Sequence, residues 1–356
     1  MKTISYSIVS LHYLKYFIPL IERLNKYKHI MYYHKISKIH QCPFKNLSFL
    51  KNISKKYNFE LKYKNDFKNE KTILFVIEGE PPVIHSNRKY KIISLNYCTD
   101  FFVLAPTYIN YIDYTINTFN DNFIDICCKN IKNNFIWKKY LSIHNSQIIK
   151  EKQKFFVNPK YYNVKFFNKE NIINKYKLIN EKKYIFFFLP QKENLLPLKK
   201  IFTFFIKKKY ILLLKIRNKH EYSNNFQNFC NENKSIYYFN DTKNYYPSIT
   251  LELIYISSFI FNNDSSGLIE GIMLNKPIIN YKNNNNYSTL SNVISDNCNF
   301  YFNINNFNEL TTAYNKIYNL LINEKKLIID IINFKKKYFA YENSEKDFIK
   351  FIEDIN

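Results

Sequence analysis

A run of polar residues and glycine, Asp264-Ser265-Ser266-Gly267, is the part of the sequence best suited to chemistry, and Glu270 follows it three residues later. The run comes after an apolar stretch of strand length, and Asp264, Ser265 or Ser266 could cap a helix that starts there. The first amides of such a helix are directed outward and bind anions. The run therefore predicts a phosphate-binding turn, and the plainer alternative is a helix cap and tight turn of the kind that any α/β fold needs.

Glycine is rare in this chain and is concentrated near that turn. The three glycines are Gly79, Gly267 and Gly271, so two of them fall within one predicted strand, turn and helix. A sequence this poor in glycine is expected to keep it where the backbone needs a positive φ, or where another backbone or a ligand comes close. The segment 259–281 is therefore the best candidate for a binding site.

The first half of the chain offers candidates for a general base. The loop 78–82 follows an apolar run and combines the remaining glycine with two glutamates and two prolines, which makes it the best candidate for an acceptor side. A group transfer to a hydroxyl needs a base within hydrogen-bond reach of that hydroxyl. The catalytic candidates are Glu80, His85 and Asp100, with His12 as a fourth, because each follows a predicted strand. The simpler alternative for each of them is a cap or loop residue.

The elements that would position these residues follow an alternating pattern. Apolar runs of strand length alternate with helix-period segments through about the first 130 residues, as in an open parallel sheet. The strands expected there are 3–11, 30–34, 72–77, 91–95 and 101–104, and the helices are 13–26, 44–57 and 108–119. After a polar connection over 129–182 the pattern restarts, with strands at 184–189, 210–215, 235–239, 258–262 and 277–281. Helices are expected at 195–207 and 221–231, in a stretch before 256, from the turn to 275, and over the final 50 residues.

This organisation predicts an α/β protein of two domains, as the length of 356 residues also favours. The first, over 1–165, is a Rossmann-like domain with a linker, and the second, over 166–325, is a Rossmann-like domain that would hold a nucleotide. Helices over 326–356 complete the chain.

The segment around the turn resembles the donor site of a known family. Asp264-Ser265-Ser266-Gly267, Glu270, and then Asn275-Lys276-Pro277-Ile278-Ile279 resemble the donor-site signature of GT-B glycosyltransferases and their relatives. Among these, the sequence is most similar to polysaccharide-type transferases, CDP-glycerol glycerophosphotransferases and UDP-N-acetylglucosamine 2-epimerases. Asn275 stands where that signature usually has glycine. The resemblance implies a GT-B fold, with two Rossmann-like domains whose parallel sheets face a cleft and with a helical C-terminal tail.

The resemblance also implies roles for single residues. The turn 264–267 would hold the diphosphate of the donor, and Glu270 would accept hydrogen bonds from the ribose hydroxyls; the alternative for Glu270 is an exposed helix acid favoured by the helix dipole. A basic group from Lys215, Arg217 or His220 is expected near the phosphates, although for each of these residues taken alone a solvated side chain is the simpler interpretation, since basic residues occur throughout the chain. The implied function is transfer of a sugar, or a glycerol-phosphate-like group, from a nucleoside-diphosphate donor to a glycan or lipid-linked acceptor. No metal and no cofactor are expected to take part.

Three alternatives remain open: a nucleotide-sugar 2-epimerase, a non-catalytic basic protein that binds nucleic acid or anionic membrane, and a degenerate transferase without activity. The formal charge of +24 suggests the second, but only three of the 53 basic residues are arginines, the side chain that base readout favours. Abundant lysine, asparagine, isoleucine, tyrosine and phenylalanine are typical of A+T-rich coding, which explains the charge more simply. Nucleic acid is therefore not an expected partner, while contact with anionic lipid stays open.

The cysteines and the apolar runs bear on where the protein works. The six cysteines have no spacing typical of a zinc site, so buried free thiols are expected. No run of about 18 uncharged apolar residues occurs, and the first residues read as a core strand rather than as a secretory signal. We expect a cytoplasmic protein, with peripheral contact at the inner membrane face left open.

Overall fold

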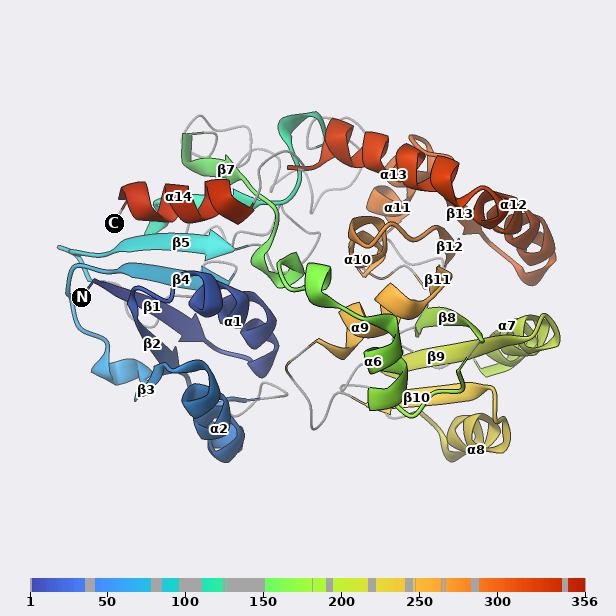
Figure 1. Cartoon of the computed structure of the whole chain (residues 1–356), viewed down its shortest axis with the longest axis horizontal. Helices are drawn as coiled ribbons and strands as arrows, with labels where there is room; N and C mark the ends of the chain where they lie inside the picture. Colours follow the sequence, from blue (N-terminus) through green and yellow to red (C-terminus); the bar gives the residue numbers. More distant parts are fainter. Residues whose placement is uncertain are drawn as a thin grey trace. The chain divides into compact units, whose positions relative to one another are not determined.

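Parallel strands form two separate sheets in this chain, and each sheet belongs to its own unit of the computed structural model (Figure 1). Unit 1 consists of Met1–Asn163 and Tyr338–Asn356, and unit 2 consists of Val164–Lys337. Unit 2 therefore interrupts unit 1 in the sequence. The structure describes residues 2–35, 42–77, 85–95, 111–123, 126, 151–180, 182–189, 195–216, 222–240, 246, 248–263, 265, 267–282, 288–340 and 345–355.

Unit 1 is built on a seven-stranded parallel sheet with the order β3-β2-β1-β4-β5-β6-β7. The order reverses at β1, because the chain first moves outward to β3 and then crosses to β4 on the other side, as in a Rossmann-like sheet. The strands are β1 (Thr3–Ile8), β2 (Lys28–Tyr33), β3 (Glu60–Tyr63), β4 (Ile73–Ile77), β5 (Lys91–Leu95), β6 (Tyr114–Asn117) and β7 (Gln153–Phe155).

One face of this sheet is covered by helices from both ends of the sequence. Tyr6 of β1 packs on Phe17 of α1 and stacks on Phe75 of β4, with ring centroids 5.1 and 5.6 Å apart. Phe75 also contacts Phe348 of α14, which Figure 1 shows lying along unit 1. The helical segments that the structure describes in this unit are η1 (Leu11–Tyr13), α1 (Leu14–Arg23), η2 (Phe44–Asn46), α2 (Leu47–Tyr57), η3 (Lys64–Asp66), η5 (Pro159–Tyr161) and α14 (Glu345–Ile355).

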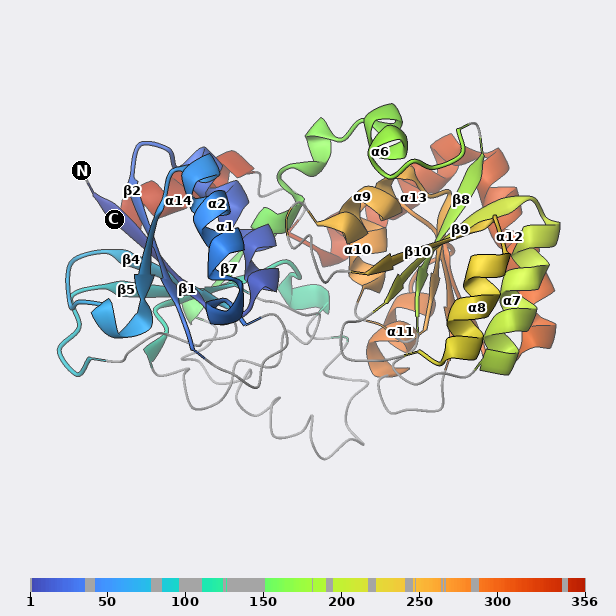
Figure 2. The same cartoon turned by 90° about the horizontal axis from the view of Figure 1, so that it is seen from below.

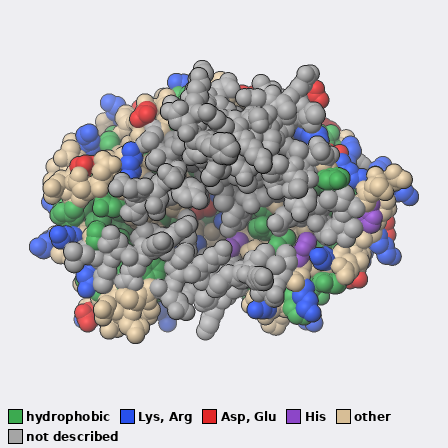
Figure 3. All heavy atoms as spheres, turned by 180° about the vertical axis from the view of Figure 1, so that it is seen from behind, with side chains coloured by type: hydrophobic (Ala, Val, Ile, Leu, Met, Phe, Trp, Pro, Cys, Tyr) green, Lys and Arg blue, Asp and Glu red, His purple; other side chains and the backbone are tan. Residues whose placement is uncertain are grey.

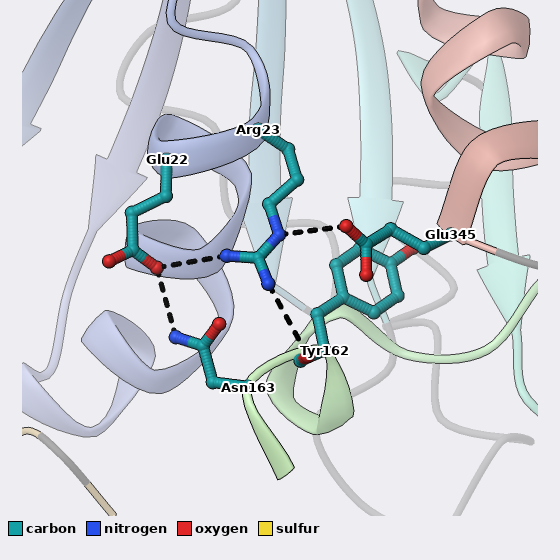
Figure 4. Close-up of polar contacts among 5 residues, drawn as sticks. All are labelled: Glu22, Arg23, Tyr162, Asn163 and Glu345. Carbon is teal, nitrogen blue, oxygen red and sulfur yellow. Dashed lines mark hydrogen bonds and ion pairs between the residues drawn. The ribbon is translucent and has the colours of Figure 1, made fainter. Parts of the chain in front are cut away.

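Arg23 fastens α14 to the rest of unit 1 (Figure 4). Its Nε donates to Glu345 of α14 at 2.9 Å, one terminal nitrogen donates to Glu22 at 3.1 Å, and the other donates to the carbonyl of Tyr162 at 3.3 Å. Asn163 donates to the same Glu22 carboxylate at 2.9 Å. The Arg23 side chain is 14% exposed, so the fork of one guanidinium joins α1, the segment after η5 and α14 in a largely dry environment.

Unit 2 repeats the same topology with six parallel strands in the order β10-β9-β8-β11-β12-β13. The order reverses at β8, which is the first strand of unit 2, as β1 is the first strand of unit 1. The strands are β8 (Lys183–Phe188), β9 (Tyr210–Ile216), β10 (Ile236–Asn240), β11 (Phe259–Asn262), β12 (Ile278–Tyr281) and β13 (Tyr301–Ile304).

Helices cover both faces of the second sheet (Figure 2). On one face α7, α8 and α12 bury a cluster of aromatic side chains that centres on Phe187, Phe205 and Phe261. On the other, α9 and α10 pack against β8 and β11. Strands covered on both sides must be apolar throughout, which explains runs such as 184–188. The helical segments described in this unit are η6 (Val164–Phe166), α6 (Lys169–Lys175), α7 (Leu195–Lys207), α8 (Asn224–Glu232), α9 (Ile249–Ile256), α10 (Leu268–Met273), α11 (Ser288–Ser295), η7 (Phe307–Glu309), α12 (Leu310–Ile322) and α13 (Glu324–Tyr338).

The α/β class and the two Rossmann-like sheets are confirmed, and one predicted element is wrong. A helix was expected over 108–119, but β6 occupies Tyr114–Asn117. The β-branched residues Thr115 and Ile116 are buried there and suit a strand. The short strands β3, β7 and β13 were not predicted, and the expected strand 101–104 lies outside the described residues. None of the helices that the structure describes is long and apolar enough to span a bilayer.

Replacing Arg23 by lysine is expected to lower the free energy of unfolding by about 1–3 kcal/mol. The guanidinium donates to its three acceptors from three separate nitrogen atoms, and an ammonium with a single nitrogen lacks this spread of donors. The urea midpoint of the full chain measures the change. Lys26→Gln serves as the matched control, since Lys26 pairs with Glu353 of the same helix α14 but both side chains are exposed. The control is expected to change little. An Arg23→Lys midpoint equal to that of the control would contradict the anchoring role.

Candidate functional site

The predicted phosphate-binding turn lies where the strand order of unit 2 reverses. β9 and β10 lie on one side of β8, and β11, β12 and β13 lie on the other. Ligands of open parallel sheets bind outside the carboxyl ends of the strands at such a switch point. The turn leaves β11 after Asn262, directly beside β8, so the topology places it where a ligand is expected. Ser265 and Gly267 are described, whereas Asp264 and Ser266 lie outside the described residues.

Ser265 is buried and holds the turn together from the inside. Its Oγ accepts a hydrogen bond from the amide of Gly267 at 3.3 Å, and its carbonyl accepts from the amide of Leu268 at 3.2 Å. Helix α10 starts at Leu268 and has only six residues, with Gly267 at its N-cap position and no side-chain cap. The sequence predicts that Asp264, Ser265 or Ser266 caps a helix running to 275. The helix is shorter and Ser265 closes the turn before it, while Asp264 and Ser266 lie outside the described residues.

The two glycines of this segment allow α10 to lie close against the sheet. Gly267 has φ −61°, so it is not required by a left-handed backbone. A Cβ atom added to Gly267 would lie 2.1 Å from Cζ of Phe188 at the end of β8. A Cβ atom on Gly271 would lie 2.4 Å from Cδ1 of Ile260 and 3.1 Å from Cδ1 of Ile278. Side-chain packing, rather than backbone conformation, explains both residues.

Asn275 takes over a role that glycine usually has. Its φ is +59°, the left-handed region in which asparagine is the best-tolerated residue after glycine. The amide of Lys276 donates to the carbonyl of Gly271 at 2.9 Å, and that of Asn275 donates to Ile272 at 3.1 Å, which together form a Schellman motif that ends α10. Lys335 donates to Oδ1 of Asn275 at 2.6 Å. The departure from the usual glycine is thus accommodated in the structure.

Two of the charged residues predicted for the donor site, Glu270 and Lys215, are among the residues that the structure describes in unit 2. Glu270 is only 7% exposed, so the alternative of a solvated surface acid is wrong. Lys215, near the end of β9, donates a hydrogen bond to the hydroxyl of Thr250 at the start of α9. Lys215 also pairs in register with Phe188, whose ring lies on Gly267. Arg217 and His220 lie outside the described residues.

The candidates in unit 1 fall in different places. His85 lies against Tyr90 and Phe67, with ring centroids 5.9 and 6.1 Å away, and its backbone amide donates to the Tyr90 hydroxyl. These aromatic contacts favour a packing role for His85. His12 lies in η1, directly after β1 and therefore at the point where the strand order of unit 1 reverses. Glu80 and Asp100 lie outside the described residues, although β4, which pairs with β1, ends three residues before Glu80.

A buried histidine and serine pair was not predicted from the sequence. His34 follows β2 at the carboxyl edge of the sheet, and its Nε2 lies 2.9 Å from Oγ of Ser7 in β1. His34 is 5% exposed, and burial, helped by Lys64, lowers its pKa to about 4. It is therefore neutral at pH 7 and too weakly basic to serve well as a general base. The alternation of the strands, rather than a motif, puts the two side chains on one face.

In the part of the chain that the structure describes, the thiols and the surface charges add no further site. Cys42 and Cys230 are buried free thiols and Cys298 is a partly buried one, and burial raises the pKa of both Cys230 and Cys298 to about 12. Among the described residues, no three His, Cys, Asp or Glu side chains group as a metal site would require. Lysine and arginine side chains of the described residues are scattered over the face in Figure 3 rather than gathered into one patch.

Gly271→Ala is expected to lower the free energy of unfolding by about 1–3 kcal/mol, because the added methyl group overlaps Ile260, although alanine normally favours a helix interior. Ile260→Val removes the overlapping Cδ1. Ile260→Val alone should lower the free energy of unfolding, but in the double variant it should recover part of the stability that Gly271→Ala loses. Urea midpoints of the three variants measure this coupling. A Gly271→Ala protein more stable than the parent would disprove the packing explanation.

Acidification is expected to destabilise unit 1 through its buried histidines. The pKa of His34 in the folded state lies below its unfolded value, so the unfolded chain binds the proton first and stability falls as the pH drops from about 7 towards 4. The loss from His34 between pH 7 and pH 5 is about 2 kcal/mol. Burial also lowers the pKa of His29, which acts in the same direction. In His34→Gln the difference between urea midpoints at the two pH values should shrink, and an unchanged difference would show that His34 does not contribute.

Comparison with known proteins adds the fold family. No family model matches the chain, and no curated protein matches it either. Solved structures match over nearly its whole length. The Wall Teichoic Acid Polymerase TagF matches with TM-score 0.60 and 11% identity, covering 99% of this chain and 88% of that chain. Arabidopsis thaliana UGT89C1 complexed with UDP matches with TM-score 0.59 and 7% identity, covering 100% of both chains.

A third match is the S. aureus MnaA-UDP co-structure, with TM-score 0.53 and 12% identity, covering 96% of this chain and 92% of that chain. At identities this low the similarity concerns the fold. Two parallel sheets with the same reversing strand order, helices on both sides of the second, and full-length similarity to these structures lead to one conclusion: the chain has the GT-B fold of two Rossmann-like domains.

Proposed function

We propose that the protein is a glycosyltransferase that moves a sugar, or a glycerol-phosphate-like group, from a nucleoside-diphosphate donor to a glycan or lipid-linked acceptor. The observation that carries the proposal is the position of the segment 262–277. It starts at the switch point of unit 2, and it includes a carboxylate that is 7% exposed in the first turn of α10. Two proteins of the same fold were solved with UDP, which supports a nucleotide-activated donor.

In the proposed donor site each residue has a specific part. The turn Asp264-Ser265-Ser266-Gly267 would bind the diphosphate, and Glu270 would accept hydrogen bonds from ribose hydroxyls. A carboxylate kept from water makes stronger hydrogen bonds to hydroxyls than a solvated one does, which is why its burial supports this role. Lys215 of β9, or His220 five residues later in the sequence, would supply positive charge toward the leaving phosphate group.

In the reaction itself, the acceptor hydroxyl would lose its proton to a base and its oxygen would form the new bond to the transferred group. In sugar transfer the bond between the sugar and the diphosphate would break, and the nucleoside diphosphate would leave with the electron pair. In transfer of a glycerol-phosphate-like group the bond between the two phosphates would break, and the nucleoside monophosphate would leave with the electron pair. Among the described residues His12 is the best-placed base, because it lies in η1, the first helical segment after β1, at the switch point of unit 1. Glu80 follows the adjacent strand β4, and Asp100 follows β5. We propose that the transfer needs no metal ion, so a chelator should leave the rate unchanged.

Glu270→Gln is expected to weaken the affinity for the preferred nucleoside diphosphate by about 10- to 100-fold, since a charge-assisted hydrogen bond contributes about 1.5–3 kcal/mol. Titration calorimetry with UDP, CDP, GDP and ADP measures this after a thermal-shift screen has identified the preferred nucleotide. Glu252→Gln is the matched control. Glu252 is also 7% exposed and also lies in the first turn of a helix of unit 2, and the hydrogen bonds that its carboxylate accepts from Lys175 and Tyr176 give it a structural role.

The control is expected to lose stability and to keep its nucleotide affinity. If no nucleoside diphosphate binds the parent protein at millimolar concentration, the donor site is refuted. If a nucleotide binds the parent, and Glu270→Gln and Glu252→Gln lower the affinity for it equally, Glu270 has no specific role. Once a donor is known, product analysis separates transfer, which releases the nucleotide, from epimerisation, which returns an isomeric nucleotide sugar.

A further inference from the structure

Three asparagines form a row across the second sheet beside the turn. Asn262 of β11 pairs in register with Asn280 of β12, and Asn280 pairs with Asn303 of β13. Asn262 and Asn280 are 0% exposed. Asparagine is disfavoured in strands, and burying its amide costs free energy unless hydrogen bonds replace water. A chain rich in asparagine can supply the residues, but composition alone does not align them in register.

Their amides bind one another in sequence. Nδ2 of Asn262 donates to Oδ1 of Asn280 at 2.8 Å, and Nδ2 of Asn280 donates to Oδ1 of Asn303 at 3.0 Å. Nδ2 of Asn303 then donates to Oγ of Ser295 in α11 at 2.9 Å. Ser291, also in α11, accepts from Asn280 at 2.9 Å and donates to Asn303 at 2.8 Å. We refer to Asn262, Asn280, Asn303, Ser291 and Ser295 as the amide ladder.

The contact between Asn262 and the turn determines which way each side-chain amide of the ladder is oriented. Nδ2 of Asn262 also donates to the carbonyl of Ser265 at 3.2 Å. A carbonyl can only accept, so the group that faces it must be the NH2 of Asn262, and this choice sets the orientation of each following amide. Oδ1 of Asn262 is left buried with no hydrogen-bond partner among the described residues. Among the described residues, the end of the ladder that lacks a hydrogen-bond partner thus lies next to the turn, and such exceptions in native structures require an explanation.

We propose that the amide ladder positions the donor-binding turn, so that Asn262 and Asn280 are positioning residues although Asn280 lies a strand away from it. The Asn262 amide holds the Ser265 carbonyl, and Asn280 holds that amide in the one rotamer that reaches the carbonyl. Asn303 and the α11 serines fix Asn280 in turn. The consequence for ligand binding depends on the proposed function, whereas the consequence for the turn itself does not.

The test compares Asn280→Leu with Tyr301→Phe. Leucine has nearly the shape of asparagine and removes the link between Asn262 and the rest of the ladder. Tyr301→Phe deletes a buried hydroxyl that donates to Ser291 at 3.0 Å, on the side of the network away from the turn. Both variants should lose stability. The affinity for UDP and CDP is therefore measured by calorimetry at least 15 °C below the melting temperature of each variant, where only folded protein is present.

Asn280→Leu is expected to weaken the affinity for the nucleotide that the parent binds by about 5- to 10-fold. Tyr301→Phe is expected to weaken the same affinity by less than about twofold. Hydrogen–deuterium exchange at the amides of Gly267 and Leu268 should accelerate in Asn280→Leu and not in Tyr301→Phe. If both variants behave alike in affinity and in exchange, the ladder only stabilises the sheet and the proposal is overturned. Should neither UDP nor CDP bind the parent, the proposed function loses support, and the exchange comparison still decides on the ladder. Asn303→Leu replaces Asn280→Leu if that variant does not fold.

Discussion

The close packing of α10 on the second sheet is the constraint on which the candidate site depends. Gly267 and Gly271 leave no side chain between this helix and Phe188, Ile260 and Ile278. Because the helix lies so near the strands, the turn before it is brought directly over the end of β8, where the strand order reverses. Glu270 lies in the same helix and is 7% exposed. A helix held farther from the sheet would move the turn away from the switch point.

The candidate site depends, second, on the polar side chains at the carboxyl edge of the sheet of unit 2. The strands of unit 2 are apolar along most of their length, and the amides of Asn262, Asn280 and Asn303 appear only where β11, β12 and β13 end or nearly end. This edge is the place where a buried polar group serves a purpose, since the backbone there leaves the sheet and must be held by something other than a strand partner. Unit 1 has an analogous arrangement in Ser7 and His34, at the ends of β1 and β2.

Much of the fold could be predicted from the sequence, because strands covered on both faces and amphipathic helices leave strong patterns. Helix α7 has the bounds 195–207 that periodicity predicts. The pattern failed for β6, where the short segment Tyr114–Asn117 carries little periodic signal and its burial depends on neighbours distant in sequence. For the candidate site, the residue types of the turn led to a segment that the topology places at the switch point of unit 2, whereas the burial of Glu270 could not be predicted, since it depends on tertiary packing. The amide ladder was equally hidden, because register between strands far apart in sequence decides which asparagines meet.

The discontinuity of unit 1 has a consequence for how the chain reaches its native state. Phe348 and Ile352 of α14 belong to the core of unit 1 and are 0% exposed, yet they follow all of unit 2 in the sequence. The Arg23–Glu345 contact spans 322 positions. During synthesis unit 2 leaves the ribosome as one continuous segment before α14 has been made. The apolar face of α1 and β4 therefore stays uncovered until then. Unit 1 must therefore remain incompletely packed, and in need of protection from association, until its partner sequence has emerged.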